Sequence, residues 1–172
     1  EPLCLDDWIV PVTVKETEIY AQKMLEKNIK PEFEVYNTQH FNIVHNLIRK
    51  QLVQMPLWYS IIFSTYMGGI AVPGNLRNFV NVLDNLPNDS IFQAIGVGQA
   101  QLPMTALAIL VGGHVRVGME DNIHYMRGEL LESNSQMVLK IVRLAEELGR
   151  TIATPSQARE MLQISQTPST YP

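Results

Sequence analysis

Two kinds of apolar pattern alternate along this chain of 172 residues. Four short segments are continuously apolar and rich in β-branched and aromatic residues, which is typical of parallel strands with both faces covered. They are 33–37, 57–64, 90–98 and 114–119. Segments with helical spacing separate them, at 39–53, 73–86, 101–112 and 133–148. The order predicts an α/β fold built from strand–helix units of about thirty residues, the size of a βαβ unit.

Local signals place several helix ends. A Ser or Thr followed three residues later by Glu or Gln predicts a capped helix start. Pro73 fits a first helical position, and Gly149 supplies a C-terminal stop. The first of these helices is expected to run to about Asn28. The capping pairs are Thr13–Glu16, Ser133–Gln136 and Thr154–Gln157.

Composition narrows the class of protein. Hydrophobic residues make up 46% and charged residues 17%, which is typical of a globular chain and excludes a disordered one. The net charge of −4 without a basic run argues against a nucleic-acid partner, and no apolar run is long enough for a membrane span. One cysteine, Cys4, excludes an internal disulfide framework. We therefore expect a cytoplasmic protein with one domain over 1–172 and a short tail helix at about 155–163.

Two architectures use repeated strand–helix units, the open doubly wound sheet and the closed eight-stranded barrel. A barrel needs roughly 250 residues, whereas this chain supplies four strands. Periodicity alone leaves both architectures open.

Charged residues gather around the last predicted strand. Arg116 lies inside it, and Glu120 and Asp121 lie at or just past its carboxyl end, where parallel α/β folds carry their chemistry. Arg116 and Glu120 are expected on the same face by strand alternation. An arginine facing a barrel interior needs an acidic partner. Two acids and an arginine could hold a metal and act as a base, or they could form an ion pair that only closes the sheet.

Other candidate residues have weaker signals. Glu34 is an acid inside a strand, so it either has a partner or lies near the strand end. The four histidines lack the spacing of a zinc site and are expected to be structural. The glycines of "GVGQAQ" (96–101) are expected to allow close backbone approach, and the loop "YMGGIAVPGN" (66–75) could bind an anion.

The motifs in combination resemble a known family. "PEFEVYN", "GVGQAQLPM", "GGHVRVGMEDNIHYMRGELLESNSQMV" and "LAEELGRTIATPSQAREML" occur in this order, and the stretch "RVGMEDN" is the most specific. From about residue 10 to 163 the chain is similar to the β-keto acid cleavage enzymes, such as 3-keto-5-aminohexanoate cleavage enzyme. The resemblance implies a (β/α)₈ TIM barrel, with the strands here similar to strands five to eight, so that the chain supplies about half a barrel.

The resemblance also implies an activity and a set of roles. Family members combine a β-keto acid with acetyl-CoA and release acetoacetate and an acyl-CoA. Glu120 matches a glutamate ligand of a zinc ion whose other ligands are two histidines. Arg116 and Asp121 match the dyad that deprotonates the substrate, and Glu34 matches a pocket-lining glutamate that contacts the substrate.

This chain departs from the family in one respect, since it has no HxH pair. Catalytic zinc sites use three protein ligands, and a half barrel leaves open sheet edges. We expect the isolated chain to be inactive and to need the missing amino-terminal half or another copy of itself, as a homo-oligomer. The alternatives are a non-catalytic half barrel that binds a partner, and an open α/β domain that binds phosphate at 66–75.

Overall fold

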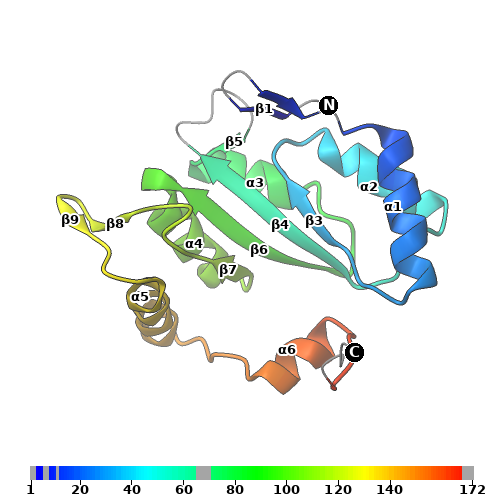
Figure 1. Ribbon diagram of the computed structural model, residues 1–172. Helices are drawn as coiled ribbons and strands as arrows, with labels where there is room; N and C mark the ends of the chain where they lie inside the picture. The colour runs from blue at the N-terminus through cyan, green and yellow to red at the C-terminus, as the bar shows by residue number, and fades with distance from the viewer. Residues whose placement is uncertain (1–2, 6–7, 11, 65–70, 168–172) are drawn as a thin grey trace.

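The computed structural model describes residues 3–5, 8–10, 12–64 and 71–167. Its centre is a parallel sheet of five strands in the order β3-β4-β6-β7, with β5 paired to the end of β4 (Figure 1). The predicted α/β class with a mainly parallel sheet is confirmed. The strands are β3 (Glu32–Val35), β4 (Leu57–Ser64), β5 (Val72–Pro73), β6 (Ser90–Val97) and β7 (His114–Arg116).

Six helices and two small hairpins accompany this sheet in the described part of the chain. The helices are α1 (Val14–Glu26), α2 (His40–Arg49), α3 (Leu76–Leu83), α4 (Gln101–Leu110), α5 (Asn134–Glu147) and α6 (Pro155–Met161). The hairpins are β1 (Leu3–Leu5) with β2 (Trp8–Val10), and β8 (His124–Met126) with β9 (Glu129–Leu130). Among the described residues, none of the helices is both long and apolar enough to cross a membrane.

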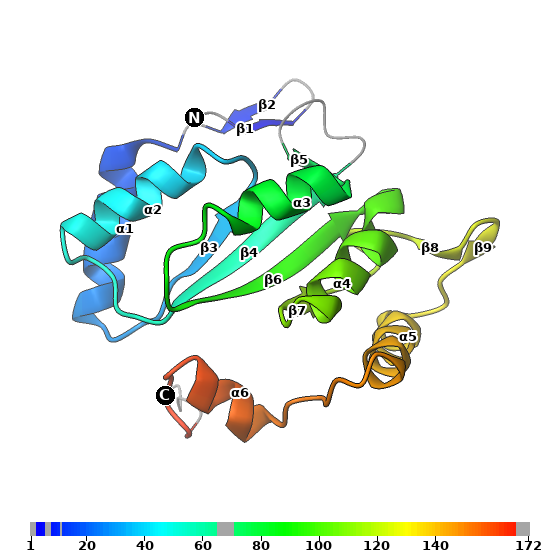
Figure 2. The same cartoon turned by 180° about the vertical axis from the view of Figure 1, so that it is seen from behind.

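One face of the sheet is covered by helices α2, α3 and α4, as the two opposite views show (Figures 1 and 2). Alternate residues of β4, including Tyr59 and Phe63, point to this face and are fully buried. Phe63 stacks on Phe79 of α3, with 5.4 Å between the ring centroids. Burial of each such side chain contributes roughly 1.5–3 kcal/mol to folding, so this face holds the main core.

The opposite face, called the polar face below, carries the other alternate residues. Its polar members include Glu32, Glu34, Ser60, Gln93 and Arg116, and the apolar side chains of Ile62 and Ile95 lie on the same face. Strand register sets their neighbours, since Glu34 lies opposite Ser60, Ser60 opposite Gln93, and Gln93 opposite His114. The sheet therefore separates an apolar, helix-covered face from one that bears charge.

Helix α5 packs away from the main core. Its buried residues Met137, Ile141 and Ala145 form a second cluster with Ile109 of α4 and with Leu131. The segment after α5 leads to α6, which stands apart from the sheet (Figure 1). A cavity of about 910 Å³ lies along β7, with α5 and the segment 150–161 as its other walls. The cavity therefore borders an edge strand, because β7 is the last strand in the order of the described sheet.

Local capping chemistry explains several of the helix starts, mostly as predicted. The reciprocal boxes of Thr13 with Glu16 and of Thr154 with Gln157 are confirmed. At α5, Ser133 accepts from the backbone N–H of Gln136, but the Gln136 side chain accepts from Glu132 instead, so this cap is not reciprocal. Gly149 ends the α5 segment with a φ of 73°.

Several predicted boundaries are wrong, including the end of α2, which lies at Arg49 rather than at residue 53. Pro73 does not begin a helix but lies in β5, and α3 begins at Leu76 after the N-cap Asn75, whose side chain accepts from the backbone N–H of Asn78. The last strand ends at Arg116 rather than at residue 119. The acids that follow therefore lie in a turn, where strand alternation no longer fixes which way a side chain points.

Candidate active site at the carboxyl end of β7

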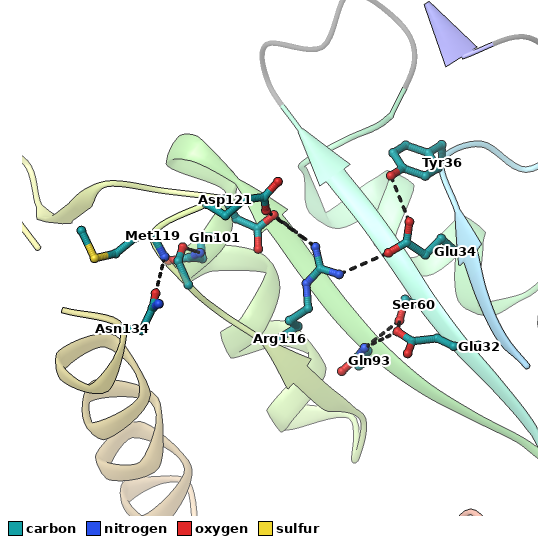
Figure 3. A network of polar contacts seen from close by, with 12 residues as sticks. Glu32, Glu34, Tyr36, Ser60, Gln93, Gln101, Arg116, Met119, Asp121 and Asn134 are labelled. Atoms are coloured by element: carbon teal, nitrogen blue, oxygen red, sulfur yellow. Dashed lines mark hydrogen bonds and ion pairs between the residues drawn. The ribbon is translucent and has the colours of Figure 1, made fainter. Parts of the chain in front are cut away.

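The centre of the site is the guanidinium of Arg116, the last residue of β7. Its Nη1 donates to Glu34 Oε1 at 3.2 Å, and its Nη2 donates to Asp121 Oδ1 at 3.4 Å (Figure 3). Glu34 comes from β3, at the far edge of the sheet, and Asp121 comes from the turn after β7. One arginine thus joins two carboxylates from opposite edges of the sheet across the polar face.

The two adjacent acids behave differently. The Asp121 side chain is 7% exposed, whereas the Glu120 side chain is 87% exposed and its Oε2 lies 3.9 Å from Arg116 Nη2. Glu120 therefore lies within ion-pair distance of Arg116 but in water, and the expectation that strand alternation places both on one inward face stays a prediction, because the strand ends at Arg116. The neighbouring Asp121 carboxylate, by hydrogen bond and by charge, raises the pKa of Glu120.

The turn that carries Asp121 is held at several points. The backbone N–H of Gly98, at the end of β6, donates to the Asp121 carbonyl at 2.7 Å. The fully buried side chain of Gln101 donates to the Gly118 carbonyl at 3.2 Å and accepts from Asn122 at 3.4 Å. Asn134 at the start of α5 accepts from the backbone N–H of Met119 at 2.7 Å. These contacts orient Asp121, and the sequence motifs had not indicated Gln101.

A second polar group lies nearer the amino ends of the strands. Glu32 Oε1 accepts from Ser60 and, at 2.9 Å, from Gln93, and Gln93 also donates to Ser60 Oγ at 2.6 Å (Figure 3). Ser60 is fully buried and Gln93 is 9% exposed. The buried Ser60 hydroxyl and the Gln93 amide nitrogen thus find hydrogen-bond partners within the group.

The histidines occupy structural positions. His40 Nδ1 accepts from the backbone N–H of Tyr36 at 3.3 Å, and its ring lies edge-on to Tyr36. The His114 ring lies 5.8 Å from the Trp58 ring, and burial lowers its pKa, with Arg150 adding to the effect. His124 is exposed. His40 and His114 thus contact neighbouring rings within the fold, and the structural role expected for all four histidines stays a prediction.

The glycine-rich segments have separate outcomes. A Cβ at Gly96 would lie 2.3 Å from Gln101 Cα, so the expected close backbone approach is confirmed. For the loop 66–75, residues 65–70 lie outside the described residues. Of the loop expected to bind an anion, only residues 71–75 are described, and there the Asn75 side chain caps α3. The anion site stays a prediction.

The described residues on their own do not fit a zinc ion. Among them, no three His, Cys, Asp or Glu side chains gather closely enough to hold a metal. Glu120 could supply a single carboxylate, and Asp121 and Glu34 are both engaged by Arg116. Catalytic zinc sites take three protein ligands, so the ligand set is incomplete in this part of the chain.

The fold and the cluster together define the class of the protein. It is a parallel α/β protein whose charged side chains meet at the carboxyl ends of the strands, where such folds carry catalytic groups. Residues 3–164 match the model of the beta-keto acid cleavage enzyme family, and the chain belongs to that family.

Curated relatives agree with this assignment. The chain is 39% identical over 146 residues to the 3-keto-5-aminohexanoate cleavage enzyme of Acetoanaerobium sticklandii, an alignment that covers 85% of this chain and 52% of the relative. It is 29% identical over 161 residues to the 3-dehydrocarnitine:acetyl-CoA trimethylamine transferase of Rhizobium meliloti, covering 94% of this chain and 52% of that protein. It is 35% identical over 136 residues to the 3,5-dioxohexanoate:acetyl-CoA acetone transferase of Paraburkholderia graminis, covering 77% of this chain and 43% of that protein. The chain spans about half the length of the curated relatives it matches.

Proposed function

We propose that this chain supplies the base of a β-keto acid cleavage enzyme, which condenses a β-keto acid with acetyl-CoA and yields acetoacetate and an acyl-CoA. Family membership and the names of the relatives, two of which include acetyl-CoA, support the reaction class. The observation that carries the proposal is the pairing of a nearly buried Asp121 with Arg116 at the carboxyl end of the sheet.

In this proposal Asp121 removes the proton from the carbon beside the keto group. Its side chain is shielded from bulk water, and Arg116 holds one carboxylate oxygen, so the other can face a substrate. The carbanion that remains attacks the thioester carbonyl of acetyl-CoA. The CoA thiolate displaced in this step adds to the keto carbonyl of the substrate. Cleavage of the bond between that carbonyl carbon and the newly acetylated carbon releases acetoacetate and leaves the acyl-CoA. Glu34 lines the substrate pocket and holds the second nitrogen of the guanidinium.

The proposal includes zinc bound in part by Glu120. Because the described residues gather no three possible ligands at the site, the histidine ligands would come from outside the chain. The high exposure of Glu120 leaves its carboxylate accessible to a metal ion.

We propose further that this chain forms about half of a TIM barrel. Strands β3 and β7 are the ends of the sheet among the described residues, and unpaired edges invite a further strand. The cavity of about 910 Å³ beside β7 is lined by Val115 and Val117 of the edge and by Ile141 and Ala145 of α5. It would receive a strand from the amino-terminal half of the family fold, or from another copy of the chain in a homo-oligomer.

Complementation of the two halves tests this proposal. The chain would be expressed alone and together with the amino-terminal part of the Acetoanaerobium sticklandii relative, and acetoacetate formation from β-keto acids and acetyl-CoA would be followed with and without Zn²⁺. We expect turnover only from the pair and only with zinc. In the pair, Asp121→Asn should reduce turnover by about 10²-fold or more, the range of general-base catalysis.

Asp84→Asn is the matched control, since Asp84 is an exposed aspartate at the end of α3, outside the cluster. It should leave turnover unchanged. A pair that associates and binds zinc but produces no acetoacetate would refute the activity. Association that persists without turnover would favour the non-catalytic interaction protein, whereas turnover by the chain alone would refute the need for a second half.

A further inference from the structure

The hydroxyl of Tyr36 also belongs to the cluster around Arg116, and the proposed function gives it no role. Tyr36 follows β3 directly, and its Oη donates to Glu34 Oε2 at 3.1 Å. The other oxygen of the same carboxylate, Oε1, accepts from Arg116 Nη1 at 3.2 Å (Figure 3). Each oxygen of Glu34 therefore has a different partner.

This arrangement bears on how Arg116 is shared. A guanidinium facing a carboxylate commonly forms two parallel hydrogen bonds with it. Here the two terminal nitrogens are divided between two carboxylates instead, Nη1 to Glu34 and Nη2 to Asp121 at 3.4 Å. If Glu34 offered both oxygens to Arg116, the guanidinium would turn toward β3 and leave Asp121.

The contacts of Tyr36 hold its hydroxyl in place as a hydrogen-bond donor to Glu34 Oε2. The Tyr36 backbone N–H donates to His40 Nδ1 at 3.3 Å, and its ring packs on the cluster of Ile62 and Ile95 on the polar face. Burial, and then the negative charge of Glu34, raise the pKa of Tyr36 to about 12. The hydroxyl consequently stays protonated, and remains a donor, throughout the physiological pH range.

We propose that Tyr36 is a positioning residue that restricts Glu34 to a single-oxygen contact with Arg116 and so keeps the second guanidinium nitrogen on Asp121. The consequence for catalysis rests on the proposed function, in which Asp121 is the base. The positioning itself is a property of this chain and can be measured without turnover.

Double-mutant cycles on the unfolding of the 172-residue chain test this role. One cycle combines Arg116→Met with Asp121→Asn, and the other combines Arg116→Met with Glu34→Gln. Both are measured with Tyr36 present and in the Tyr36→Phe background, which keeps the ring and removes only the hydroxyl. We expect Tyr36→Phe to weaken the Arg116–Asp121 coupling and to strengthen the Arg116–Glu34 coupling, each by about twofold, because a bidentate arginine–carboxylate pair adds a second charge-assisted hydrogen bond.

Tyr125→Phe is the matched control. The Tyr125 hydroxyl accepts from Arg143 at 3.1 Å, outside the cluster, so its removal should change neither coupling. A purely structural role for the Tyr36 hydroxyl would leave both couplings unchanged or lower both, and either outcome overturns the proposal. If the couplings shift in opposite directions while the paired halves show no turnover, the proposed function fails and the positioning role stands.

Discussion

The coupling between Arg116 and Asp121 is the most direct energetic test of the site. At the observed 3.4 Å, two unit charges interact by about 1 kcal/mol in water and by about 5 kcal/mol at an effective dielectric constant near 20. Asp121 is 7% exposed, but Arg116 is 40% exposed, so water screens one partner. We expect a net coupling of about 1–2 kcal/mol, between the values of exposed and buried ion pairs.

Thermal or urea unfolding of the wild type, Arg116→Met, Asp121→Asn and the double variant measures this coupling. Each kcal/mol should move Tm by about 2–4 °C in a chain of this size. The ion pair of Lys50 with Glu18 provides the comparison. It is shorter, at 2.7 Å, but more exposed on both sides, with side-chain exposures of 49% and 24%.

The comparison separates distance from burial. If burial governs the energy, the Arg116–Asp121 pair couples more strongly despite its longer distance. An equal or stronger coupling for Lys50–Glu18 would refute the reasoning that makes Asp121 a shielded carboxylate. It would also remove the observation on which the proposed base depends.

Two further predictions concern single residues. Because Asp121 raises the pKa of Glu120 above 4.5, the folded state disfavours the charged form of Glu120, and this penalty is absent below pH 4.5 and grows as pH rises through the folded pKa. Glu120→Gln should therefore be more stable than the wild type at pH 7, by less than about 1 kcal/mol, and as stable as the wild type below pH 4.5. A series of Tm values against pH in which this variant is less stable than the wild type at pH 7 would contradict the prediction. Tyr59 is fully buried, and within the described structure its hydroxyl has no hydrogen-bond partner. Tyr59→Phe should therefore leave the free energy of unfolding unchanged or raise it by about 1 kcal/mol. A loss of that size in urea unfolding would show that the hydroxyl has an unrecognised partner.

The sequence by itself determined the features that depend on near neighbours. Capping boxes involve residues three apart, so Thr13 with Glu16 and Thr154 with Gln157 could be predicted with the helices they begin. The continuous apolar run 57–64 predicted β4 to the residue, because nearly every residue of this central strand is buried and a buried strand needs no alternation. The short hairpins at 3–10 and 124–130 were missed, since two- and three-residue strands leave almost no periodic pattern.

The tertiary structure alone decided how the charged residues are used. Arg116 meets Glu34 from 82 positions away only because β4 and β6 set the width and register of the sheet between them. The adjacent acids Glu120 and Asp121 look equivalent in the sequence. Hydrogen bonds from Gly98 to the Asp121 carbonyl and from Gln101 to the Gly118 carbonyl orient the turn that carries them. As a result, Asp121 is buried and Glu120 faces water. Side-chain direction in a turn depends on contacts that are distant in sequence, and no local pattern encodes it.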